Sequence, residues 1–170
     1  EKLNMIGDKE SDLSYSWYVR NRNNELIEQL KKNLYNFFFN KKVLWTENGY
    51  RKSSGANNLW TTFKEYKNQL SGKGYSKGFL SCNVRATNLY KDKTVIAYMI
   101  NRYLNPVIKN FFVNKNIKVD EESYSVSEML QFIWRSGIRE GKHITLYIPS
   151  RRMRNLLIAW ILFQSKLEEN

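Results

Sequence analysis

Residues 125–141 read SVSEMLQFIWRSGIREG, and the rest of the chain is interpreted around this stretch. Apolar or small residues recur in it at intervals of three or four positions, which predicts a helix with one face packed against a core. Gly141 is the expected end of that helix, since glycine commonly stops helices. The packed face would hold Val126, Met129, Leu130, Ile133 and Gly137.

A second stripe on the same predicted helix carries hydrogen-bonding groups. Gln131, Arg135 and Arg139 follow one another at intervals of four residues, so they would share one side of the helix. Two guanidinium groups one turn apart suit the binding of a phosphate, because each presents several N–H donors in a fixed plane. An ordinary solvated charged face is the alternative that this stretch leaves open.

Predicted strands and helices alternate from about residue 41 onward. This alternation predicts an α/β fold with a mostly parallel sheet and helices on both faces. We expect an N-terminal arm and helix over residues 1–40 and the α/β domain over residues 41–170. The predicted strands are residues 41–46, 79–83, 94–100 and 144–148, and the further predicted helices are residues 25–39, 59–70, 105–112 and 150 onward.

Polar turns follow three of the predicted segments, at residues 83–88, 101–105 and 150–154. In parallel sheets, functional groups gather at the carboxyl ends of the strands. In the first turn, Arg85, Thr87 and Asn88 could hold a nucleic-acid backbone, or the turn could merely satisfy its own polar groups.

Basic side chains gather at two further places. Arg151, Arg152 and Arg154 fall in the first turn of the last predicted helix, where the helix dipole favours negative charge. A bound phosphate would reverse that mismatch, and a tolerated basic surface is the alternative. Lys73 and Lys77 lie in a glycine-rich loop near several tyrosines, which resembles a surface that stacks bases and attracts phosphates.

Composition limits the possible functions. The chain has 170 residues, with 28 Lys and Arg against 16 Asp and Glu, so its net charge is +12. This excess indicates a polyanionic partner, nucleic acid before an anionic membrane surface. One Cys and one His exclude an internal disulfide and make a zinc site implausible. The four Asp are too dispersed for a metal-dependent nuclease, and no apolar run is long enough to span a bilayer. The expected location is the cytoplasm.

Two motifs in this order resemble a known family. Residues 83–88 read NVRATN and residues 131–141 read QFIWRSGIREG, and together they resemble motifs V and VI of the second RecA-like domain of superfamily 2 helicases. Helicase-like proteins of bacteriophages and mobile elements are the closer look-alikes, over about residues 72–160. The resemblance implies that Arg135 and Arg139 are arginine fingers directed at ATP, with Gln131 beside them. It also implies that residues 83–88 touch the nucleic-acid strand.

The chain departs from the family pattern in two ways. Arg139 follows Arg135 after four residues where the family usually has three, and the sequence has neither a phosphate loop nor an Asp-Glu box. The resemblance therefore implies half of a motor, inactive alone. ATP and Mg²⁺ would bind only together with a first RecA-like domain, in cis or in trans, and the strand would be DNA in preference to RNA. The alternative is a standalone basic accessory protein of a phage that binds nucleic acid or a host factor without catalysis.

Overall fold

The computed structural model describes residues 4–40, 43–46, 49–52, 55–84 and 89–168. The helices are α1 (Tyr15–Arg20), α2 (Glu25–Asn40), α3 (Lys67–Leu70), α4 (Pro106–Asn114), α5 (Glu121–Ile133) and α6 (Arg151–Glu168). The strands are β1 (Val43–Thr46), β2 (Gly49–Lys52), β3 (Asn58–Thr61), β4 (Val95–Tyr98) and β5 (Thr145–Tyr147).

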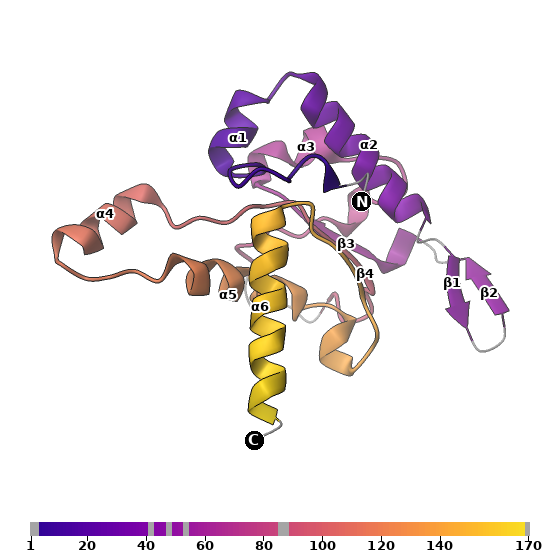
Figure 1. The fold of residues 1–170 in the computed structure, drawn as a ribbon. Helices are drawn as coiled ribbons and strands as arrows, with labels where there is room; N and C mark the ends of the chain where they lie inside the picture. The colour runs from indigo at the N-terminus through magenta and orange to yellow at the C-terminus, as the bar shows by residue number, and fades with distance from the viewer. Residues whose placement is uncertain (1–3, 41–42, 47–48, 53–54, 85–88, 169–170) are drawn as a thin grey trace.

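A parallel sheet in the order β3-β4-β5 lies at the centre of the molecule (Figure 1). Trp60 of β3 pairs with Ala97 of β4, and Ala97 pairs with Tyr147 of β5. Strands β1 and β2 form a separate antiparallel hairpin. Phe79 makes an isolated parallel bridge to Trp60 on the side of β3 that does not face β4. After β3 the chain therefore runs to that outer side first, and then passes back over β3 to form β4 on the other side.

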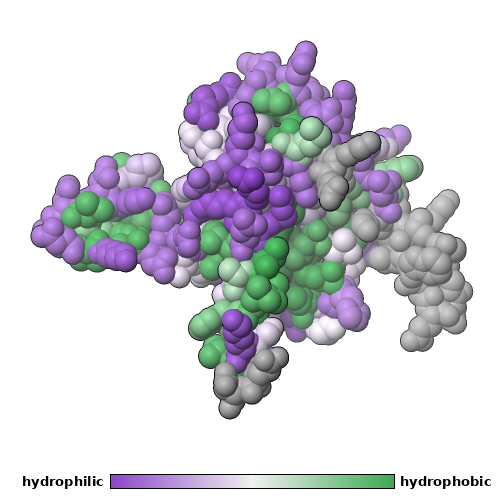
Figure 2. All heavy atoms as spheres, viewed as in Figure 1, coloured by the Kyte–Doolittle hydropathy of each residue, from purple (hydrophilic) through white to green (hydrophobic). Residues whose placement is uncertain are grey.

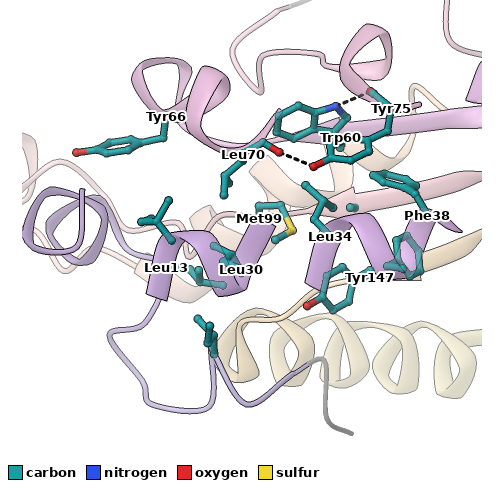
Figure 3. Packing of buried hydrophobic residues seen from close by; sticks show 14 of the residues in the cluster. Leu13, Leu30, Leu34, Phe38, Trp60, Tyr66, Leu70, Tyr75, Met99 and Tyr147 are labelled. Atoms are coloured by element: carbon teal, nitrogen blue, oxygen red, sulfur yellow. Dashed lines mark hydrogen bonds between the residues drawn. The ribbon is translucent and has the colours of Figure 1, made fainter. Parts of the chain in front are cut away.

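Both faces of the sheet are covered, as the sequence predicts. Successive residues of a strand point to opposite faces. Ala97 and Met99 pack with the N-terminal helices in one core, whereas Ile96 and Tyr98 pack with α5 and α6 in the other. Figure 3 shows the first core, where the Trp60 indole N–H donates to the Tyr75 carbonyl at 3.0 Å. The predicted α/β architecture with helices on both faces is therefore confirmed.

The N-terminal segment packs onto the sheet through aromatic side chains. Trp17 and Tyr18 of α1 are buried, and the Tyr18 hydroxyl donates to the Met99 carbonyl at 2.7 Å. Just past β4, Asn101 donates through Nδ2 to the carbonyls of Glu10 and Asp12, at 2.6 and 2.9 Å. The helical N-terminal region is thus present, and the proposed division of the chain at residue 40 stays a prediction.

Two of the elements predicted between residues 59 and 83 were wrong. Residues 59–70 are not one helix, because the chain forms β3 first and only a short 3-10 turn and α3 afterwards. Leu59 and Trp60 are both fully buried, each in a different core, which a strand between two helical layers permits. The predicted strand at residues 79–83 is reduced to the single bridge of Phe79.

Candidate functional site

The carboxyl ends of β3 and β4 form the most favourable place for a ligand. The chain turns back across the sheet between these two strands, and open α/β sheets bind ligands at the carboxyl ends of strands beside such a reversal. Thr61 ends β3, and Asn101 and Arg102 follow β4. Polar and charged side chains from α5 and α6 converge on this edge, which we call the carboxyl edge.

The Arg135 side chain contacts the segment just before the motif predicted to touch a strand. Its Nη1 donates to the carbonyl oxygen of Cys82 at 3.4 Å, and its side chain is half-buried. Burial raises the pKa of the Cys82 thiol, while the charges of Arg102 and Arg135 oppose that rise. The contact places Arg135 beside Cys82, the residue directly before the motif with which the sequence analysis paired it. Arg85, Thr87 and Asn88 themselves lie outside the described residues.

The predicted continuous helix over residues 125–141 was wrong. Helix α5 ends at Ile133, and a separate 3-10 helix spans Gly137–Glu140. Ser136 makes the break, because its hydroxyl donates to the Ile133 carbonyl at 2.6 Å and accepts from the Ile138 N–H at 3.4 Å. The Gly137 N–H is drawn away from the helix to the Lys93 carbonyl, at 2.8 Å.

This break separates the three residues of the predicted polar stripe. Gln131 lies on α5 and is exposed, Arg135 follows the end of α5, and Arg139 lies on the 3-10 helix and is exposed. They do not share one helix face. Of the three, Arg135 contacts Cys82, directly before the motif at residues 83–88, so it is the strongest candidate for a functional role. Gly141, with a φ of 70°, ends the 3-10 helix and not the longer helix that was predicted.

A second group of polar side chains lies around Arg102, in the predicted polar turn at residues 101–105, but its partners were not predicted from the sequence. Arg102 pairs with Glu128 at 3.2 Å and donates to the Tyr124 hydroxyl at 3.2 Å. The Tyr98 hydroxyl and the Arg102 Nε are buried and have no hydrogen-bond partner among the described residues. Burial also raises the pKa of Tyr98 well above its usual range, so this hydroxyl stays protonated. Buried polar groups without partners call for an explanation, and a binding site is one; sequence periodicity does not reveal such groups.

The three arginines at the start of α6 have different surroundings. Arg152 donates through Nη1 to the Asn101 Oδ1 at 3.2 Å and to the Arg102 carbonyl at 2.7 Å. Arg154 donates to the carbonyls of residues 148 and 149, at 2.8 and 2.5 Å. Arg151 is exposed and lies 3.7 Å from an Asp8 carboxylate oxygen. Two of the three guanidinium groups therefore secure the fold, and Arg151 is the one that faces solvent most openly.

The glycine-rich loop lies at the opposite edge of the sheet. Lys73 and Lys77 are exposed, and Lys77 lines a pocket of about 430 Å³ beside the amino ends of β3 and β4. Lys93 also lines this pocket, and its Nζ donates to the Ala56 carbonyl. These lysines are not brought together with Arg135, so the predicted nucleic-acid-binding residues divide between the two edges of the sheet.

Across the described parts of the chain, no group of three or more His, Cys, Asp or Glu side chains is placed to hold a metal ion. Each described helix is too short or too polar to run through a lipid bilayer. His143 is exposed, just before β5.

Comparison with known proteins places the chain among phage-related sequences. A protein of Bacillus subtilis (strain 168), described as SPbeta prophage-derived uncharacterized protein YonV, is 46% identical to the chain over 159 residues. The match covers 94% of this chain and 36% of that relative, so the chain spans about a third of the relative's length. No solved structure matches the chain. The family model described as the YonV C-terminal Rossmann-like domain matches residues 1–161, and the chain therefore belongs to this family of Rossmann-like domains.

Proposed function

We propose that the domain is the nucleic-acid-binding half of a superfamily 2 helicase-like motor. It holds a strand at the carboxyl edge and presents Arg135 to a nucleotide that a first RecA-like domain binds. The observation that carries the proposal is the contact of Arg135 with the Cys82 carbonyl, at 3.4 Å. It unites the strongest phosphate-binding candidate with the segment that the motif resemblance assigns to the strand.

Charge supports a strand as the partner. The net charge of +12 attracts a polyanion and speeds encounter with it. Arg102 and Arg135 both lie near Cys82, so positive charge is present where the two motifs meet. Phosphate oxygens are the groups that such arginines bind best, because the guanidinium offers parallel N–H donors.

The residues of this chain suit a domain that assists nucleotide hydrolysis, rather than one that binds the nucleotide and its metal ion by itself. The sequence has no phosphate loop, and the described residues offer no carboxylate cluster for a metal ion. The nucleotide phosphates and Mg²⁺ would therefore be held by another domain. A guanidinium brought up to them stabilises the negative charge that develops during phosphoryl transfer. The YonV relative is nearly three times as long as the matched region, which leaves room in that protein for such a domain.

ATP hydrolysis tests the proposal in a polypeptide that joins this domain to a first RecA-like domain. Arg135→Ala should lower nucleic-acid-stimulated turnover by about 10³-fold or more, the range measured for arginine fingers. Arg20→Ala is the matched control, because Arg20 is an exposed arginine of α1, which packs on the other face of the sheet. Unfolding midpoints of both variants would show that the fold is intact.

Two outcomes would decide against the motor. Undiminished turnover in the Arg135→Ala variant would remove the assigned role of Arg135. Strand binding without any stimulated hydrolysis in the unmodified polypeptide would instead favour the accessory binding protein without catalysis.

A further inference from the structure

Helix α4 is an apolar helix that buries none of its side chains. Val107, Phe111 and Val113 are 76%, 58% and 55% exposed, and no residue of the helix is buried. Figure 1 shows α4 standing away from the body at the end of two extended segments. Figure 2 shows hydrophobic and hydrophilic residues side by side on this projection, which we call the α4 arm and define as residues 103–119.

Local interactions define the helix of the arm at both ends. The Asn105 side chain accepts from the Val107 N–H at 2.9 Å, and Pro106 occupies the first turn. At the other end, Asn116 has a φ of 58°, and the Ile117 N–H donates to the Phe112 carbonyl at 3.0 Å. Helices this short are marginal in water without such support. The caps specify a helix that stands without packing against the body.

The root of the arm is fixed to the carboxyl edge. Glu121 of α5 accepts from the Leu104 N–H at 3.0 Å and pairs with Lys109 at 2.8 Å. Ser125 donates to the Arg102 carbonyl at 2.8 Å, and Arg152 stacks over the Tyr103 ring at 4.3 Å. The arm therefore leaves the body in a set direction, from the carboxyl edge.

The outer face of the arm combines an aromatic ring with positive charge. Phe111 and Lys115 are four residues apart, so they lie on one side of the helix. Residues 105–119 include Lys109, Lys115 and Lys118 and no Asp or Glu. A wholly apolar partner that covered Phe111 would also remove Lys115 from water without an anion to pair it, which is unfavourable.

We infer that the α4 arm is a second contact for single-stranded nucleic acid, with a base stacked on Phe111 and phosphates bound by Lys115 and Lys118. This inference rests on the proposed function, since the strand is the one held at the carboxyl edge. A base offers apolar surface to the exposed face of the Phe111 ring, whose edge contact is with Phe112. The phosphates offer negative charge to Lys115 and add to that of Asp120, which already lies near Lys118. Aromatic rings beside cations are the usual means of binding single strands without sequence preference.

Fluorescence anisotropy with a labelled oligothymidylate tests the aromatic contact. Phe111→Ala should weaken binding by about 5- to 150-fold, the range for loss of one stacked base. Because the Phe111 ring is exposed, its removal leaves the fold intact. Phe163→Ala is the matched control, since Phe163 of α6 is also 58% exposed and lies on a different helix. The control should bind as the unmodified chain does.

The salt dependence of the same binding tests the lysines. The double variant Lys115→Gln, Lys118→Gln should lower the slope of log affinity against log salt by about 1.4, since each phosphate contact on a single strand contributes about 0.7. The control double variant Lys31→Gln, Lys32→Gln on α2 removes the same amount of charge. Its slope of log affinity against log salt should stay steeper than that of the Lys115→Gln, Lys118→Gln variant. Lys109 is kept unchanged because it pairs with Glu121.

The outcomes separate this inference from the proposed function. Salt-dependent strand binding that is equal in the unmodified chain and in both arm variants would overturn the inference and leave the proposed function standing. No strand binding by the unmodified chain would refute both. Phe111-dependent binding to anionic phosphatidylserine vesicles, or Phe111-dependent self-association in sedimentation, without an effect on strand binding would also overturn the inference.

Discussion

Replacing Arg152 by alanine should destabilise the domain far more than replacing its neighbour Arg151. Arg152 donates to the Asn101 Oδ1 at 3.2 Å, the Arg102 carbonyl at 2.7 Å and the Ser125 hydroxyl at 3.1 Å, and it covers the Tyr103 ring. Hydrogen bonds from a charged donor contribute about 1.5–3 kcal/mol each, and an arginine over a ring about 1 kcal/mol.

These contributions do not add in full. The Arg102 carbonyl keeps its bond from Ser125 after the substitution, and Arg152 is only half-buried. We therefore expect Arg152→Ala to reduce the free energy of unfolding by about 2–3 kcal/mol, or the melting temperature by about 5–10 °C. Arg151 is exposed with a long contact to Asp8, so Arg151→Ala should change the free energy by about 0.5 kcal/mol or less.

Urea unfolding, followed by circular dichroism, measures both variants under the same conditions. Arg152→Lys adds a further comparison, because lysine keeps the charge and loses the planar fork, and it should recover only part of the loss. A loss below about 1 kcal/mol for Arg152→Ala would refute the structural role given to this side chain. An equal loss for Arg151→Ala would show that charge at the start of α6, rather than the geometry of Arg152, sets the stability.

Two further predictions concern close packing and pH. Gly78→Ala should destabilise the domain by about 1–3 kcal/mol in urea unfolding, because an added Cβ would lie 2.3 Å from the Asn58 carbonyl oxygen, whereas the exposed neighbour Ser76 should tolerate alanine. Burial alone would raise the pKa of Glu121, but the hydrogen bonds from Lys109 and the Leu104 N–H outweigh it and lower that pKa. Glu121 should therefore contribute stability above its unfolded pKa near 4.5 and lose it as pH falls through the lower folded value. A Glu121→Gln variant with an unchanged acid dependence of the urea midpoint would contradict this assignment.

Strong local signals predicted much of the fold correctly. The apolar run at residues 94–100 contains β4, and Pro106 marks the first turn of α4. The periodic stretch after Asn24 became α2, with Leu30 and Leu34 fully buried. In these segments the secondary structure that the local sequence favours is also the one that the surrounding fold requires, so the hydrophobic pattern alone predicted it.

The errors came where tertiary contacts override the local pattern. The apolar spacing from Leu59 to Leu70 also fits a helix, but pairing with β4 makes its first residues a strand. At the end of α5, helical spacing continues through Arg139, yet Ser136 and Gly137 satisfy their polar groups elsewhere and break the helix.

The candidate site was predictable only in part. Arg135 could be found from its motif, but the partners of Arg102 come from α5, more than twenty residues away. The internal bonds of Arg152 and Arg154 likewise depend on how the turn before α6 meets the end of β4. Sequence reasoning identifies such charged groups, and only the packing decides which of them remain available to a ligand.

Affinity for a labelled single strand, measured with the unmodified chain across a salt series, tests the central claim most directly. If about four phosphates are bound, affinity should fall by about 50-fold between about 50 and 200 mM monovalent salt, because bound counterions are released on binding. A strand affinity that stays flat across that range, or the absence of strand binding at the lower salt, would contradict a nucleic-acid-binding role for this domain.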